Sequence, residues 1–196
     1  MTTVVGLFDN TREADKAVDD LMQLGLTKKD IGVMARKDVL KQGKEAGQDL
    51  GADAGVGATS GTVLGGVAGL LVGIGALAIP GLGPVIAAGT LGTVLGTTAL
   101  GAGIGAATGG VVGALTGMGL SKDESHFYAE GVKRGGILVT ANVAPERVDA
   151  VTNTLRQNNA SDVNTRRQQW QQEGWQQFDD ADASMTTEPP PPAASY

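Results

Sequence analysis

The side chains that most often carry enzymatic or metal chemistry are scarce in this sequence. His126 is the only histidine and there is no cysteine, so the chain lacks a thiolate nucleophile and the cluster of nitrogen and sulfur ligands that zinc or copper requires. The acidic pairs Asp19-Asp20 and Asp179-Asp180 are adjacent in sequence, and adjacent side chains diverge on a helix. We interpret these pairs as solvated carboxylates and His126 as a packing or surface residue.

Glycine-rich loops that hold phosphate groups are also missing. Gly101-x-Gly103-x-x-Ala106 has the outline of a dinucleotide-binding loop, but it lies inside a repeating glycine run and lacks the strand pattern that precedes such a loop. The sequence has no Gly-Lys-Ser/Thr segment, and its net charge of −6 with no basic patch argues against nucleic acid as a partner. We therefore expect no catalytic residue, no cofactor and no metal site, and we predict that the protein is not an enzyme.

Glycine spacing is the most informative pattern in the chain. Residues 54–121 form a 68-residue stretch without charge, which holds 21 of the 31 glycines. Two series within it place a glycine at every fourth position: Gly57, Gly61, Gly65, Gly69 and Gly73, and then Gly101, Gly105, Gly109, Gly113 and Gly117. Residues four apart share one face of a helix, and a glycine face lets a second helix approach closely. We predict that these glycines are the helix-packing residues of a glycine zipper.

A turn is predicted between the two glycine series. It is marked by Pro80, Gly81, Gly83 and Pro84. The pattern predicts a helical hairpin, with one helix over about residues 57–79 and another over about 85–119. The first helix would be about 34 Å long, which matches a hydrocarbon core of about 30 Å. Because glycine weakens a helix in water and a bilayer enforces backbone hydrogen bonding, the pattern favours a membrane setting.

The sequence leaves two settings for this hairpin, a membrane and water. Its second arm is rich in threonine and only weakly apolar, whereas lysines flank both outer ends and the turn has none. The charge pattern favours cytoplasmic termini, as does the lack of a signal-peptide pattern at the start. We expect an integral or peripheral location on the cytoplasmic side of the inner membrane, together with homo-oligomer formation. The alternative is a soluble homo-oligomeric scaffold or binding module.

Residues 1–40 predict the order strand, helix, strand. The apolar, β-branched runs at 2–8 and 30–35 predict the strands. The helix between them has N-cap chemistry at residues 9–11 and a stop signal at Gly25.

Residues 121–167 predict a connecting helix followed by a second strand, helix and strand. Ser121 and Glu124 have the spacing of a capping box, in which each side chain accepts a hydrogen bond from a free backbone N–H. The run at 137–143 predicts a strand, and a last strand is predicted at 162–167.

Together the two halves predict an α+β fold. Its domain would be ferredoxin-like, with the order βαβ-βαβ and with the glycine-zipper hairpin of residues 41–120 inserted between the second and third strands. Two unrelated small units are the alternative, and a small-ligand sensor built on the ferredoxin-like domain is a further alternative for function. Residues 168–196 are Gln-rich, acidic and Pro-rich and predict a mostly disordered tail, whose two tryptophans would cover the domain or bind a partner.

Three segments of the sequence resemble a known family. They are the opening Val4-Val5-Gly6-Leu7-Phe8-Asp9, residues 78–89 around the predicted turn, and residues 119–139. They resemble bacterial general-stress proteins, namely the heat-induced YflT-like family and the low-temperature-induced proteins, over about residues 1–175. The resemblance implies a stress-responsive, envelope-related role without known catalytic residues.

Overall fold

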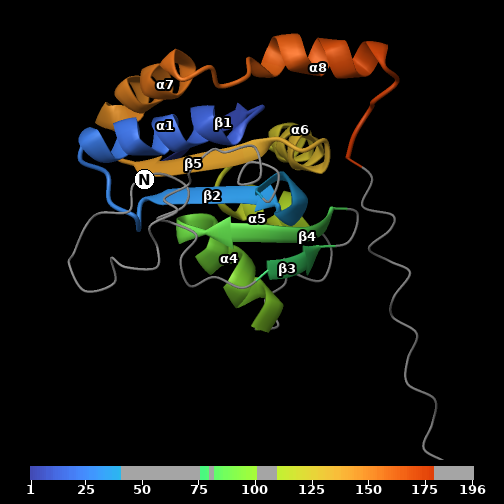
Figure 1. Cartoon of the computed structure of the whole chain (residues 1–196), viewed down its shortest axis with the longest axis horizontal. Coiled ribbons are helices and arrows are strands. Elements are labelled where there is room, and N and C mark those ends of the chain that lie inside the picture. The colour runs from blue at the N-terminus through green and yellow to red at the C-terminus, as the bar shows by residue number, and fades with distance from the viewer. Residues whose placement is uncertain (41–75, 80–81, 101–109, 179–196) are drawn as a thin grey trace, which may run out of the picture.

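The computed structural model describes residues 1–40, 76–79, 82–100 and 110–178 (Figure 1). It confirms the α+β class. In chain order the elements are β1 (Thr2–Phe8), α1 (Thr11–Gln23), β2 (Ile31–Arg36), β3 (Ala76–Ile79), β4 (Gly83–Ala88), α4 (Gly89–Leu100), α5 (Gly110–Gly117), α6 (Lys122–Lys133), β5 (Ile137–Val143), the 3-10 turn Pro145–Arg147, α7 (Val148–Gln157) and α8 (Val163–Gln172).

The five strands form one sheet in the order β1-β5-β2-β4-β3, which can be followed across Figure 1. Every neighbouring pair is antiparallel. Because β1 and β2 both run antiparallel to β5, they run in the same direction, and α1 carries the chain from one to the other past β5. The sheet is therefore assembled largely from contacts between distant parts of the sequence.

Both faces of the sheet are covered, because its buried side chains alternate. On β5, Ile137 and Val139 belong to a core shared with α1 and α7, which lie side by side in Figure 1. Leu138, between them, belongs to a second core shared with α5, α6 and Trp170 of α8. The period of two along the strand thus produces two hydrophobic cores.

Local cap chemistry fixes the helix ends as the sequence predicts. The Asn10 side chain accepts a hydrogen bond from the backbone N–H of Glu13 at 2.9 Å, and Gly25 ends α1 with a left-handed φ of 88°. Before α6, Ser121 and Glu124 form the complete capping box. These bonds satisfy backbone groups that a helix end leaves without partners.

The predicted last strand at residues 162–167 is wrong. The Asp162 side chain accepts a hydrogen bond from the Thr165 N–H at 2.8 Å and starts α8. Just before it, the Ser161 N–H donates to the Leu7 carbonyl at 2.7 Å on the outer edge of β1. An N-cap residue followed by polar residues without alternation favours a helix, so the fourth strand of a ferredoxin-like order is not formed here.

The predicted helical hairpin is wrong over residues 76–79 and 83–88, which are strands. β3 and β4 form a β-hairpin in which Ile79 pairs with Gly83, and β4 also pairs with β2. Ile79 and Gly83 each precede a proline, which disfavours helical backbone. Pro84 lies just before the pairing with β2 begins at Val85, so its missing N–H removes no bond from that ladder. Helices are confirmed further along the second arm, at 89–100 and 110–117.

Two glycines let α4 start directly against β2. Gly89 has a φ of +63°, and a Cβ there would lie 1.8 Å from the Ile31 carbonyl oxygen. A Cβ on Gly32 would lie 2.5 Å from the Thr90 hydroxyl and 2.8 Å from the Leu91 nitrogen. Only glycine fits both positions without displacing backbone, and this close approach sets where the chain turns from β4 into α4.

Replacing Gly89 tests this approach. Gly89→Ala should destabilise the fold by at least ~2 kcal/mol more than Gly25→Ala, measured by urea unfolding. Both positions have left-handed φ values, but a Cβ at Gly25 meets nothing within 4 Å, so Gly25→Ala should cost only the backbone strain of about 1–2 kcal/mol, while Gly89→Ala adds overpacking. Equal losses for the two variants would contradict the packing of α4 on β2.

Candidate functional site

The predicted helix-packing and turn residues fall mainly outside the described structure. Gly113 and Gly117 lie in α5, where a Cβ on Gly117 would meet no described atom within 4 Å, and Gly83 and Pro84 lie in β4. The others lie outside the described residues: Gly57, Gly61, Gly65, Gly69, Gly73, Gly101, Gly105, Gly109, Pro80 and Gly81.

The sheet shows where the glycine-rich stretch leaves and returns. The chain leaves at the end of β2 through residues 37–40, where Leu40 is buried in the core with α1 and α7. It returns as β3 and β4, and β4 pairs with β2 itself. In the part of the chain that the structure describes, no helix has both the length and the apolar character needed to cross a membrane.

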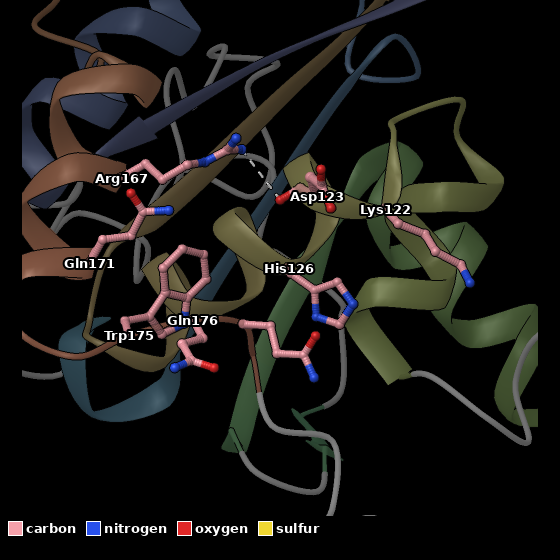
Figure 2. Close-up of a pocket in the computed structure, with 8 residues that line it drawn as sticks. Lys122, Asp123, His126, Arg167, Gln171, Trp175 and Gln176 are labelled. Carbon is pink, nitrogen blue, oxygen red and sulfur yellow. Dashed lines mark hydrogen bonds between the residues drawn. The ribbon is translucent and has the colours of Figure 1, made fainter.

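A pocket of about 400 Å³ lies where the start of α6 faces α8 and the segment after it (Figure 2). It is lined by Lys122, Asp123, His126, Arg167, Gln171, Trp175, Gln176 and Gln177. Figure 2 shows Arg167 and Asp123 at one side of the pocket and Gln176 at the other, with the rings of Trp175 and His126 between them.

The capping box at the start of α6 positions one wall of the pocket. Ser121 and Glu124 fix the first turn of the helix, and Lys122 and His126 are four residues apart, on one face. The Arg167 side chain reaches this wall from α8, because one terminal nitrogen of its guanidinium donates to the Asp123 carbonyl at 3.4 Å.

The end of α8 positions the other wall. The Gly174 N–H donates to the Gln171 carbonyl at 3.0 Å and the Trp175 N–H donates to the Trp170 carbonyl at 2.9 Å, while Gly174 has a φ of 93°. This pair of bonds is the Schellman motif, which commonly brings the residue after the glycine back onto the last helical turn. The Trp175 ring accordingly packs edge-on against Trp170, at 5.8 Å between centroids.

Stacked rings and one arginine attach this helix end to α6. The Trp170 ring stacks on Phe127 at 4.8 Å between centroids. Arg134 bonds to Glu130 at 2.7 Å and to Glu173 at 2.6 Å, and its guanidinium lies 4.9 Å from the centroid of the Trp170 ring. Partial burial lowers the pKa of Arg134, but the hydrogen bonds to both carboxylates outweigh this effect and raise its pKa above the ordinary value.

The segment that follows is also part of the fold. Phe178 is buried, with the Lys133 ammonium 5.4 Å from the centroid of its ring. Residues 168–178, which the sequence assigned to a mostly disordered tail, therefore belong to the folded domain. The boundary at residue 168 is wrong, whereas the expectation that the two tryptophans cover the domain is confirmed. The physical reason is the aromatic contact surface that α6 offers.

Three polar atoms at the pocket are buried without a hydrogen-bond partner. They are Nδ1 of His126, Nε of Arg167 and Nε1 of Trp175, and the remaining such atom in the described structure is the Asn142 side-chain oxygen. Buried polar groups without partners are rare in folded proteins, and each requires an explanation. Their concentration around one pocket marks it as the best candidate for a binding site among the described residues.

The pocket lining offers two cationic side chains, one carboxylate, three amides and an aromatic ring. The described residues contain no group of three or more histidine and acidic side chains that could hold a metal ion. The site is not predicted by the sequence pattern, which places Arg167 at the end of a predicted strand and Trp175 in a predicted tail. The dipeptide Glu173-Gly174 after a run of good helix formers is the signal that predicts a helix end and the return of Trp175.

Comparisons with protein-family models, with curated proteins and with solved structures found no match to this chain. The resemblance to general-stress proteins therefore stays a prediction.

The attachment of α8 to α6 predicts a specific role for Arg134. Arg134→Lys should destabilise the fold by about 1 kcal/mol and shift tryptophan emission to longer wavelength, because an ammonium group cannot bond both carboxylates and also cover the Trp170 ring. Both tryptophans of the chain lie in this region, so intrinsic fluorescence during urea unfolding measures it directly. Arg12→Lys, at an exposed position on α1, is the control and should change neither quantity; identical behaviour of the two variants would contradict the attachment.

Proposed function

We propose that this chain is a non-enzymatic stress-response protein that self-associates through its glycine-rich stretch. The observation that carries the proposal is the sheet pairing around that stretch. Residues 41–75 depart from β2 and return to β3 and β4, which join the same sheet. A linker between independent domains would have its two ends in different domains. Both strands that flank residues 41–75 instead belong to the same sheet.

The composition of the glycine-rich stretch supports close packing between two copies of the chain. Its glycines at every fourth position offer a face that a second helix can approach, and it carries no charge from residue 54 onward. Each glycine also costs a helix about 1 kcal/mol relative to alanine. That cost is offset where a packing partner is present, and a second copy of the same stretch has the matching face.

Association with the inner membrane is the second candidate. It is favoured by residues 54–75, which carry no charge and follow a lysine-bearing segment, since charged residues are rare in segments that contact lipid. The stress-related part of the proposal rests on the family resemblance in the sequence, which implies an envelope-related role. Without lipid, the same self-association would produce a soluble homo-oligomeric scaffold or binding module.

Neighbouring glycines provide the test. The purified full chain should form a defined species that is a multiple of 19.8 kDa by light scattering. Gly65→Leu and Gly69→Leu should each shift the mass toward the monomer, because a leucine on the packing face keeps the helices apart. Gly66→Leu adds the same side chain on a different face and should leave the mass unchanged.

Two results would contradict self-association through this face. One is a monomer at all concentrations, and the other is an equal effect of leucine at the three positions. Sedimentation with vesicles of phosphatidylcholine and phosphatidylglycerol tests membrane association, the second candidate. A chain that is monomeric in water but sediments completely with the vesicles associates with lipid and not with itself.

A further inference from the structure

We propose that the pocket between α6 and α8 binds a small organic anion through its carboxylate or phosphate group. The site goes beyond self-association, because it lies on the folded domain and not on the glycine-rich stretch. The observation behind it is that Arg167, Trp175 and His126 line one pocket and that each carries a buried nitrogen without a hydrogen-bond partner (Figure 2).

The unpartnered atoms define what the ligand must offer. Nε of Arg167 and Nε1 of Trp175 each carry a hydrogen and can only donate, while Nδ1 of His126 donates or accepts according to its tautomer. Leaving a buried donor unpaired costs about 1–3 kcal/mol. Ionised carboxylate and phosphate groups have several acceptor oxygens, so they match groups that can only donate.

The charge of Arg167 supports an anion in particular. The two nearby arginines of this region are already paired, Arg166 with Asp9 and Arg134 with Glu130 and Glu173. Arg167 forms no ion pair within 4 Å among the described residues. Its contact with Asp123 is to the backbone carbonyl, and its guanidinium lies 5.7 Å from the centroid of the Phe127 ring, so no described carboxylate within 4 Å balances its charge.

The remaining lining residues are consistent with a small anion. Lys122 adds a second positive charge at the rim, and the exposed Asp123 carboxylate is the single negative side chain in the lining. The lining therefore carries one net positive charge, because two cations face one anion. A doubly charged lining would suit larger polyanions, whereas this one suits a single anionic group.

The size and shape of the pocket indicate that the anion carries an organic part. Its volume of about 400 Å³ lies within the range of about 300–1,000 Å³ seen for small-molecule sites. The indole of Trp175 forms an aromatic wall, and the amides of Gln171 and Gln176 add adaptable donors and acceptors. The ring contact with Trp170 holds that wall in place.

Intrinsic fluorescence of the full chain tests the proposal. Inorganic phosphate and, separately, acetate should each be titrated at constant ionic strength against sodium chloride as the reference salt. At least one should give a saturable change in tryptophan emission that chloride does not, since Trp175 contacts the site directly. The stronger of the two probes identifies the ligand class as phosphate or carboxylate.

Adjacent arginines supply the matched variants. Arg167→Gln should weaken binding of the stronger probe at least ~10-fold, equivalent to about 1.4 kcal/mol, whereas Arg166→Gln should change it less than about twofold. Trp175→Phe keeps the aromatic wall but removes the donor, and should weaken binding about threefold or more, with Trp170 as the remaining fluorophore.

The outcomes decide the proposal in either direction. Absence of a saturable response to both probes overturns it, as does unchanged affinity in both Arg167→Gln and Trp175→Phe. Circular dichroism establishes that each variant is folded, and if Arg167→Gln does not fold, the comparison of Trp175→Phe with the unaltered chain decides the question. Loss of binding in these variants with an unchanged oligomer mass separates this site from self-association.

Discussion

The pairing of β2 on both of its edges is the constraint on which the rest of the fold depends. β5 pairs along one edge and β4 along the other, so three segments far apart in the sequence meet at six residues, Ile31–Arg36. The two cores form on opposite faces of this strand, because Val33 contributes to one and Met34 to the other. Bringing segments together over such sequence distances costs conformational entropy. Burial of apolar side chains that point alternately to the two faces of the sheet offsets that cost.

The same constraint links the glycine-rich stretch to the candidate site. β4 carries the chain from the stretch back to the sheet, and α5 and α6 then pack on the face that includes Met34. α6 in turn supplies Phe127, on which Trp170 stacks, and the helix end after Trp170 places Trp175 at the pocket. The pocket therefore forms only when the sheet has closed. Residues 37–40, which follow β2, end with Leu40 in the core on the opposite face of the sheet.

Local chemistry made part of this structure predictable. β1, β2 and β5 follow from apolar, β-branched runs, and the ends of α1 and α6 follow from caps such as Ser121 and Glu124, whose partners lie within four residues. β3 and β4 were misread because glycine and small apolar residues suit a helix face as well as a strand, and the choice is made by pairing with β2, about fifty residues away. Arg167 and Trp175 escaped prediction because tertiary contacts bring them together.

Disulfide cross-linking in this cysteine-free chain tests the central pairing most directly. Ala35 and Ile86 are partners in the β2–β4 register, so Ala35→Cys with Ile86→Cys should oxidise to an intramolecular disulfide that migrates faster on a non-reducing gel. Ala35→Cys with Val85→Cys is the control, since Val85 lies on the opposite face of the sheet and should remain reduced. Formation of the first disulfide alone is the result that this account predicts. Equal cross-linking of both pairs, or of neither, would show that the glycine-rich stretch does not return to β2.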